Sequence, residues 1–140
     1  MSVQAVLLPV FVLIGLTFAL LIWMAGARRK TLVSRETKIK DIALGQPNWP
    51  AGATQIGNCF SNQFELPVLF YILIALALPL RHADLVIVVL SWVFVVTRLV
   101  HAGVFVTSND LNRRSLAWFA GVVVLLVMWI YFALKTLLLI

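Results

Sequence analysis

Four long apolar runs decide what this chain can fold into. They cover about residues 3–27, 59–80, 83–106 and 116–140 of the 140-residue sequence. Each is long enough to cross a bilayer as a helix, which requires roughly 20 apolar residues. The hydrophobic content of 63% also exceeds the roughly 45–50% that is usual for soluble domains. The sequence therefore predicts an all-α integral membrane protein, a four-helix bundle that forms one domain over residues 1–140.

The first apolar run could instead belong to a cleaved signal peptide. However, residues 1–4 carry no basic side chain. The apolar stretch is also longer than the roughly 7–15 residues of a signal peptide's hydrophobic region. We therefore expect this run to be retained as the first membrane span.

The net charge of +6 is distributed unevenly between the two sides of the predicted bundle. Arg113 and Arg114 lie between spans three and four, and six basic residues lie between spans one and two: Arg28, Arg29, Lys30, Arg35, Lys38 and Lys40. Cytoplasmic connections are enriched in Lys and Arg. We therefore expect the first and third connections to be cytoplasmic and both termini to be outside. The membrane is expected to be a bacterial inner membrane. Since the basic excess acts as an orientation signal, it predicts no nucleic-acid partner.

Two ionisable residues, Glu65 and Arg98, lie inside the second and third apolar runs. Such groups cost about 2.5–3.5 kcal/mol each at membrane depth, so they are candidates for a function. Counted from the cytoplasmic ends of their spans, both lie about 12 Å deep at a rise of about 1.5 Å per residue. Asn62 and His101 match in the same way, nearer the cytoplasm. Two antiparallel spans are thus predicted to present polar side chains at two matching depths.

These residues predict a polar pocket that opens to the cytoplasm, with Arg113 and Arg114 at its rim. A pocket with more cationic than anionic groups favours an anionic, cytosolic small molecule. An alternative is a buried Glu65–Arg98 pair that only fixes the register of the helices. A second alternative is a small transporter that uses Glu65 as a proton or cation site, although a carboxylate neutralised by Arg98 would bind cations poorly.

The sequence predicts neither a metal site nor a reactive cysteine. The second histidine, His82, is expected on the opposite side of the membrane from His101, so no metal site is predicted. The single cysteine, Cys59, is expected to be a small buried hydrophobic residue rather than a reactive thiol. Pro67 removes one helical hydrogen bond and predicts a kink just after Glu65.

Three short motifs occur in order along the last three spans. Residues 62–67 read N-Q-F-E-L-P, residues 98–101 read R-L-V-H, and the N-R pair at 112–113 precedes W-F-A-G at 118–121. They resemble the N-x-x-E…P, R-x-x-H/Y and N-R…F-F-x-G motifs of the membrane-associated proteins in eicosanoid and glutathione metabolism, the MAPEG family. The family's active members include microsomal glutathione transferases and leukotriene-forming synthases, and one member is a non-enzymatic lipid-binding scaffold.

The resemblance implies a homotrimer with one glutathione site at each subunit interface, open to the cytoplasm. By position in the motifs, Asn62 and Glu65 would hold the polar backbone of glutathione, with Glu65 on its amino group. Arg98 would orient Glu65 or bind a glutathione carboxylate, and His101 would touch the tripeptide. An arginine near the start of the fourth helix stabilises the thiolate in active relatives.

That arginine is matched here by Arg113, with Arg114 as the alternate. The resemblance therefore implies a glutathione transferase or peroxidase that conjugates or reduces lipophilic electrophiles, with glutathione as co-substrate. The alternative is a non-catalytic subunit that binds a lipid or a partner. Two departures favour the alternative: Asn58 stands where active relatives often carry arginine, and Phe105 where they carry tyrosine. With these departures the chain resembles the bacterial branch of the family.

Overall fold

The computed structural model describes residues 1–138, and its regular elements are all helical. They are α1 (Val3–Val33), the short 3₁₀ helix η1 (Ile39–Asp41), α2 (Ala51–Asn62), α3 (Leu66–Ala77), α4 (Leu85–Val106) and α5 (Leu111–Leu138). Since α2 and α3 together make one span, four segments of the described chain are long and apolar enough to cross a membrane. The predicted all-α membrane fold is confirmed. The last two residues of the predicted fourth span, 139 and 140, lie outside the described residues.

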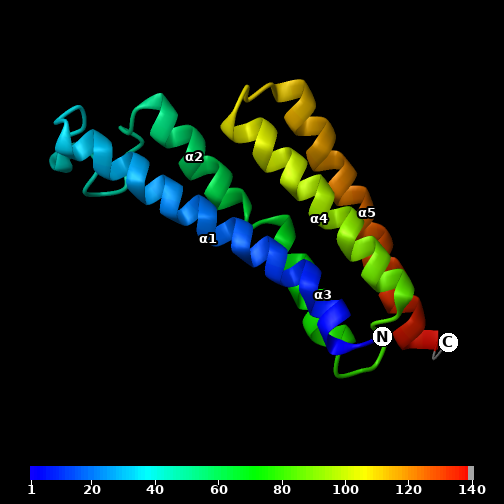
Figure 1. Ribbon diagram of the computed structural model, residues 1–140. Coiled ribbons are helices and arrows are strands. Elements are labelled where there is room, and N and C mark those ends of the chain that lie inside the picture. Colours follow the sequence, from blue (N-terminus) through cyan, green and yellow to red (C-terminus); the bar gives the residue numbers. More distant parts are fainter. Residues whose placement is uncertain (139–140) are drawn as a thin grey trace.

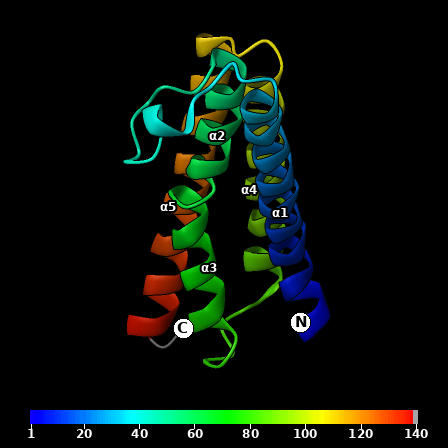
Figure 2. The same cartoon turned by 90° about the vertical axis from the view of Figure 1, so that its left-hand side faces the viewer.

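The helices form two antiparallel groups that pack side by side: α1 with α2 and α3, and α4 with α5. α4 and α5 are an antiparallel hairpin, α1 packs against α2 and α4, and α3 packs against α5 (Figure 1). Seen from the side, α1 and α4 lie on one side of the molecule and α2, α3 and α5 on the other (Figure 2). The N-terminus of α1 and the C-terminus of α5 lie at the same end of the molecule, as four antiparallel spans require (Figure 1).

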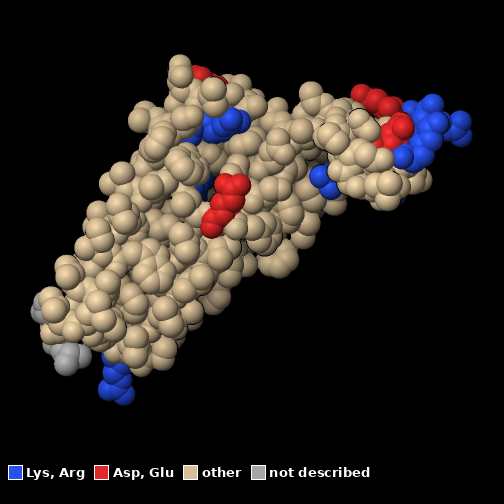
Figure 3. All heavy atoms as spheres, turned by 180° about the vertical axis from the view of Figure 1, so that it is seen from behind, with Lys and Arg blue, Asp and Glu red and all other residues tan. Residues whose placement is uncertain are grey.

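We call the end formed by the 34–50 and 107–110 connections the basic end, and the other the opposite end. The basic end carries most of the chain's Lys and Arg side chains, listed above as the orientation signal. In the view of Figure 3 most basic side chains lie at the two ends of the molecule, and the surface between them is largely uncharged apart from an acidic side chain beside a hollow. That uncharged surface is suited to contact with the lipid bilayer.

Two helices extend beyond the predicted apolar runs at the basic end. α1 continues to Val33, because Arg and Lys are good helix formers and a cation such as Lys30 is favoured in the last turn. α2 begins at Ala51, directly after Pro50, well before the predicted start at residue 59. The second span is therefore longer than predicted, and its first two turns consist mostly of small residues.

The buried core is concentrated toward the opposite end. There, α1, α3, α4 and α5 bury a large apolar cluster that includes Leu13, Phe70, Phe94 and Met128. The rings of Phe70 and Phe94 lie 5.0 Å apart between their centroids. The basic half holds a smaller cluster of buried residues, formed by Leu20, Cys59, Ala102 and Phe105. Cys59 is a buried free thiol, as expected of a small hydrophobic residue.

The opposite end is fastened by a polar network around Asp84, the N-cap of α4. One Asp84 carboxylate oxygen accepts the Ile87 backbone N–H at 3.1 Å. The other accepts a hydrogen bond from the Tyr131 hydroxyl and lies 2.6 Å from the ammonium of Lys135. Burial alone would raise the pKa of Asp84, but the hydrogen bonds from Lys135, Tyr131 and Ile87 outweigh it and hold the pKa below its usual value.

We expect Asp84→Ala to destabilise the protein by about 1–2 kcal/mol, since it removes a helix N-cap and a partly exposed ion pair. Asp84→Asn should cost less, because asparagine still caps a helix. The pKa of Asp84 is lower in the folded than in the unfolded protein, so the charge stabilises the fold above about pH 4. This contribution is lost as the pH falls through the folded pKa.

Thermal unfolding in detergent checks this prediction. The difference in melting temperature between wild type and Asp84→Asn should be present at neutral pH and should shrink below pH 4. Equal melting temperatures of wild type, Asp84→Asn and Asp84→Ala at neutral pH would contradict the network's role.

Candidate functional site

The site begins at a break in the second span between Asn62 and Leu66. Pro67 has no N–H, so the carbonyl of Gln63 has no helical partner. The N–H groups of residues 63, 64 and 65 instead donate to carbonyls three residues back, and Glu65 takes φ −98° and ψ −106°. The predicted kink is therefore a complete interruption of the helix. It leaves Asn62 at the end of α2 and Glu65 at the start of α3.

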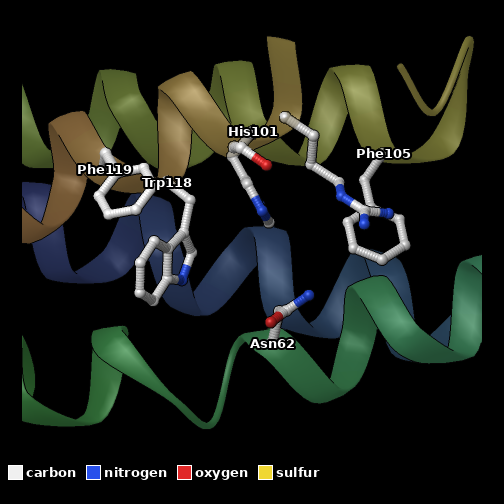
Figure 4. A pocket seen from close by; sticks show the side chains of 7 residues that line it. Asn62, His101, Phe105, Trp118 and Phe119 are labelled. Atoms are coloured by element: carbon white, nitrogen blue, oxygen red, sulfur yellow. The ribbon is translucent and has the colours of Figure 1, made fainter. Parts of the chain in front are cut away.

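Next to this break lies a cavity of about 400 Å³ between α2, α4 and α5. Asn62 and His101 point toward one another across it (Figure 4). The remaining lining residues are Phe105, Arg114, Ser115, Trp118 and Phe119. The structure thus brings together Asn62 and His101, the pair predicted to lie at matching depth, with one of the two rim arginines.

Of the two rim arginines, Arg114 lines the cavity and Arg113 does not. The Arg114 guanidinium lies 4.4 Å from the ring centroid of Phe105, and its Nη1 donates to the side-chain oxygen of Asn109 at 2.6 Å. Arg113 faces a different groove, where its Nε lies 3.6 Å from a carboxylate oxygen of Asp110. Adjacent residues on a helix point in directions about 100° apart, and Arg113 lies on the side of α5 that lines the other groove. Arg114, named above as the alternate, is thus the arginine that lines the cavity.

Glu65 lies beside the cavity and is exposed in the single chain. With the Asn62 amide oriented so that its nitrogen faces the carboxylate, that nitrogen donates to Glu65 at 2.7 Å. Across residues 1–138, the ion pairs within 4.0 Å do not include Glu65 with Arg98. The expected pair is therefore not formed within one chain. The reason is the break, which turns Glu65 toward Asn62 and the molecular surface.

Arg98 is a buried cation whose N–H groups are not all paired within the described chain. Its side chain is 1% exposed, and within the described chain its Nε and Nη2 have no hydrogen-bond partner. A Cβ on Gly121 would lie 3.6 Å from Arg98 Nη1 and 3.1 Å from the Thr97 hydroxyl. Gly121 therefore lets α5 approach α4 closely over this guanidinium. A buried charge without a partner is strongly destabilising, so an anionic partner at these two N–H groups would stabilise the fold.

Three lining residues were not among the candidates: Ser115, Trp118 and Phe119. The signal that could have found them is helical spacing, since Trp118 follows Arg114 by four residues and Phe119 follows Ser115 by four. Asn58 lies away from the cavity. It lines a separate pocket with Arg28, whose guanidinium stacks 4.8 Å from the ring centroid of Trp49.

Comparison with known proteins agrees with the motifs. A family model described as the MAPEG family matches residues 6–134, nearly the whole chain. No curated protein and no solved structure matches the chain significantly. The match includes all three motifs and every residue that lines the cavity. The chain therefore belongs to the MAPEG family.

Proposed function

We propose that this protein is a glutathione-dependent membrane transferase or peroxidase that acts on lipophilic electrophiles. The observation that carries the proposal is the cavity that places Arg114 with Asn62 and His101, in a member of a family that is generally glutathione-related. Catalysis by thiolate needs a cation, a polar anchor and an apolar wall in one place. The aromatic side chains of Phe105, Trp118 and Phe119 supply the wall.

Several polar groups in and beside the cavity are suited to the charges of glutathione, which carries two carboxylates and one ammonium group. Glu65 is the anion for the ammonium group, with its orientation set by Asn62. Arg98 offers two buried N–H groups, and Nδ1 of His101 is also buried without a partner in the described chain. A glutathione carboxylate at Arg98 would remove the penalty of that unpaired charge.

Arg114 is proposed to activate the thiol. A thiol has a pKa of about 8.5 in water and is mostly protonated at neutral pH. A guanidinium in a partly desolvated cavity favours the charged form, so it lowers the thiol pKa. The thiolate sulfur then forms a bond to the electrophilic carbon, and the leaving group or the adjacent atom takes the electron pair. In the peroxidase reaction the thiolate sulfur attacks a hydroperoxide oxygen instead, the O–O bond breaks, and its electron pair leaves with the alcohol oxygen. A second glutathione then reduces the resulting sulfenic acid, which gives glutathione disulfide and water.

We propose that the active unit is a homotrimer whose sites face the cytoplasm. Glu65 and Phe64 are exposed in the single chain, Phe64 by 58% of its surface. A carboxylate that faced lipid at this depth would be costly, so a neighbouring subunit is the natural cover for this surface. The concentration of Lys and Arg at the basic end supports the cytoplasmic orientation.

A second candidate is a non-catalytic subunit that binds a lipid or a partner. Two observations favour it: Phe105 has no hydroxyl to offer the sulfur, and Asn58 faces a separate pocket rather than the cavity.

One titration separates the two functions. The purified protein in detergent is titrated with glutathione at neutral pH, and thiolate is followed by ultraviolet difference absorbance. We expect a saturable thiolate signal. No signal, together with no binding heat by calorimetry, would contradict the transferase proposal and favour the non-catalytic subunit.

A further inference from the structure

An apolar groove lies between α4 and α5 on the surface of their hairpin, and Arg113 lines it at the basic end. The groove has a volume of about 370 Å³. Its walls include Val96, Val100 and Val104 of α4, and Ala117 and Ala120 of α5. It is separate from the cavity that holds Asn62 and His101, with which it shares no lining residue.

The groove has the length of an acyl chain in one leaflet. Because α4 and α5 are antiparallel, both walls run inward from the basic end. The α4 wall from Val104 to Val96 measures about 12 Å at a rise of about 1.5 Å per residue. One leaflet contributes about half of a hydrocarbon core that is about 30 Å thick. The small side chains of Ala117 and Ala120 hollow the α5 wall, while Val96 and Val100 are 56% and 52% exposed.

The charge at the mouth of the groove fits an anionic headgroup. The Arg113 side chain is 78% exposed, and its ion pair with Asp110 spans 3.6 Å with both partners largely solvated. Such a pair contributes at most about 1 kcal/mol. Arg113 can therefore turn to a phosphate, which a guanidinium binds through two parallel hydrogen bonds.

We infer that the α4–α5 groove binds an anionic phospholipid from the leaflet at the basic end. One acyl chain lies between the valines of α4 and the alanines of α5, and the headgroup phosphate contacts Arg113. This binding needs no glutathione. It also gives Arg113 a role that the cavity does not give it.

The test is lipid retention by the full-length protein. Wild type and variants are reconstituted into nanodiscs of phosphatidylcholine and phosphatidylglycerol, and the phosphatidylglycerol retained per chain is counted by native mass spectrometry. Arg113→Gln should reduce retention about fivefold, the equivalent of about 1 kcal/mol for one cation at an anionic surface. Ala120→Leu should also reduce it, because leucine fills the groove while the charge remains.

Two matched variants serve as controls. Arg29→Gln removes an exposed cation of α1 at the same end, and Ala75→Leu enlarges an exposed alanine of α3. Both should retain phosphatidylglycerol as wild type does. An equal loss in Arg29→Gln would reduce the effect to general attraction by the basic end, and would overturn the site. Unchanged retention in both groove variants would also overturn it. A changed oligomeric mass in Ala120→Leu with unchanged retention would mean that a second copy covers the groove instead.

Discussion

Replacing Arg114 with glutamine should remove most of the thiolate that glutathione forms on this protein at neutral pH. Glutamine keeps a polar side chain with N–H donors, although a shorter one, and loses the positive charge 4.4 Å from the centroid of the Phe105 ring. A loss of one pKa unit of stabilisation is a tenfold loss of thiolate when the thiol is mostly protonated. We therefore expect the absorbance signal to fall about tenfold, while the heat of glutathione binding persists.

Arg113→Gln is the discriminating comparison for this prediction. Arg113 faces the outer groove and not the cavity, so its replacement should leave the thiolate signal in place. If Arg113→Gln removes the signal and Arg114→Gln keeps it, the thiol lies on the other side of α5, and the cavity is not the reaction site.

Glu65→Gln should weaken glutathione binding about ten- to hundredfold. A hydrogen bond to a charged group contributes about 1.5–3 kcal/mol, and the substitution removes the anion proposed for the ammonium group of glutathione. The trimer should weaken as well, because Glu65 lies on the surface proposed to be covered by a neighbouring subunit. Calorimetry measures the affinity, and the mass of the detergent-solubilised particle measures assembly.

Glu36→Gln is the matched control for Glu65, because Glu36 is an exposed carboxylate in the connection between α1 and α2. It should change neither affinity nor assembly. Wild-type affinity and wild-type mass in Glu65→Gln would together rule out a role for this carboxylate in the site.

The number of spans and the end that carries the basic charge followed from the sequence, because both are patterns that extend over 20 or more residues. The helix bounds at the basic end did not. Arg28, Arg29 and Lys30 end the apolar run but continue α1, since a helix that leaves the bilayer still satisfies its own backbone hydrogen bonds. The first two turns of α2, which precede the predicted apolar run, were missed for the same reason.

The site was predictable only where the helix is regular. Counting residues matched Asn62 with His101, and the structure lines the same cavity with both. The same count matched Glu65 with Arg98, and the structure does not pair them within the described chain. Counting assumes a constant rise and rotation, whereas the backbone at Glu65 departs from the helix before Pro67. Arg113 and Arg114 are neighbours on one helix and point in directions about 100° apart. The spacing of the motifs did not predict which of the two faces the cavity.

The uneven core has a consequence for how the molecule opens. The opposite half is stabilised by the large apolar cluster, whereas the basic half is stabilised by the smaller cluster of Leu20, Cys59, Ala102 and Phe105. Local opening needs less free energy where fewer apolar contacts must be broken. Amide hydrogens of α2 should therefore exchange faster than those of α3, although both belong to one span. The half that contains the proposed glutathione site is thus the half that we expect to open at the lowest free energy, and the large apolar cluster can stay intact when it opens.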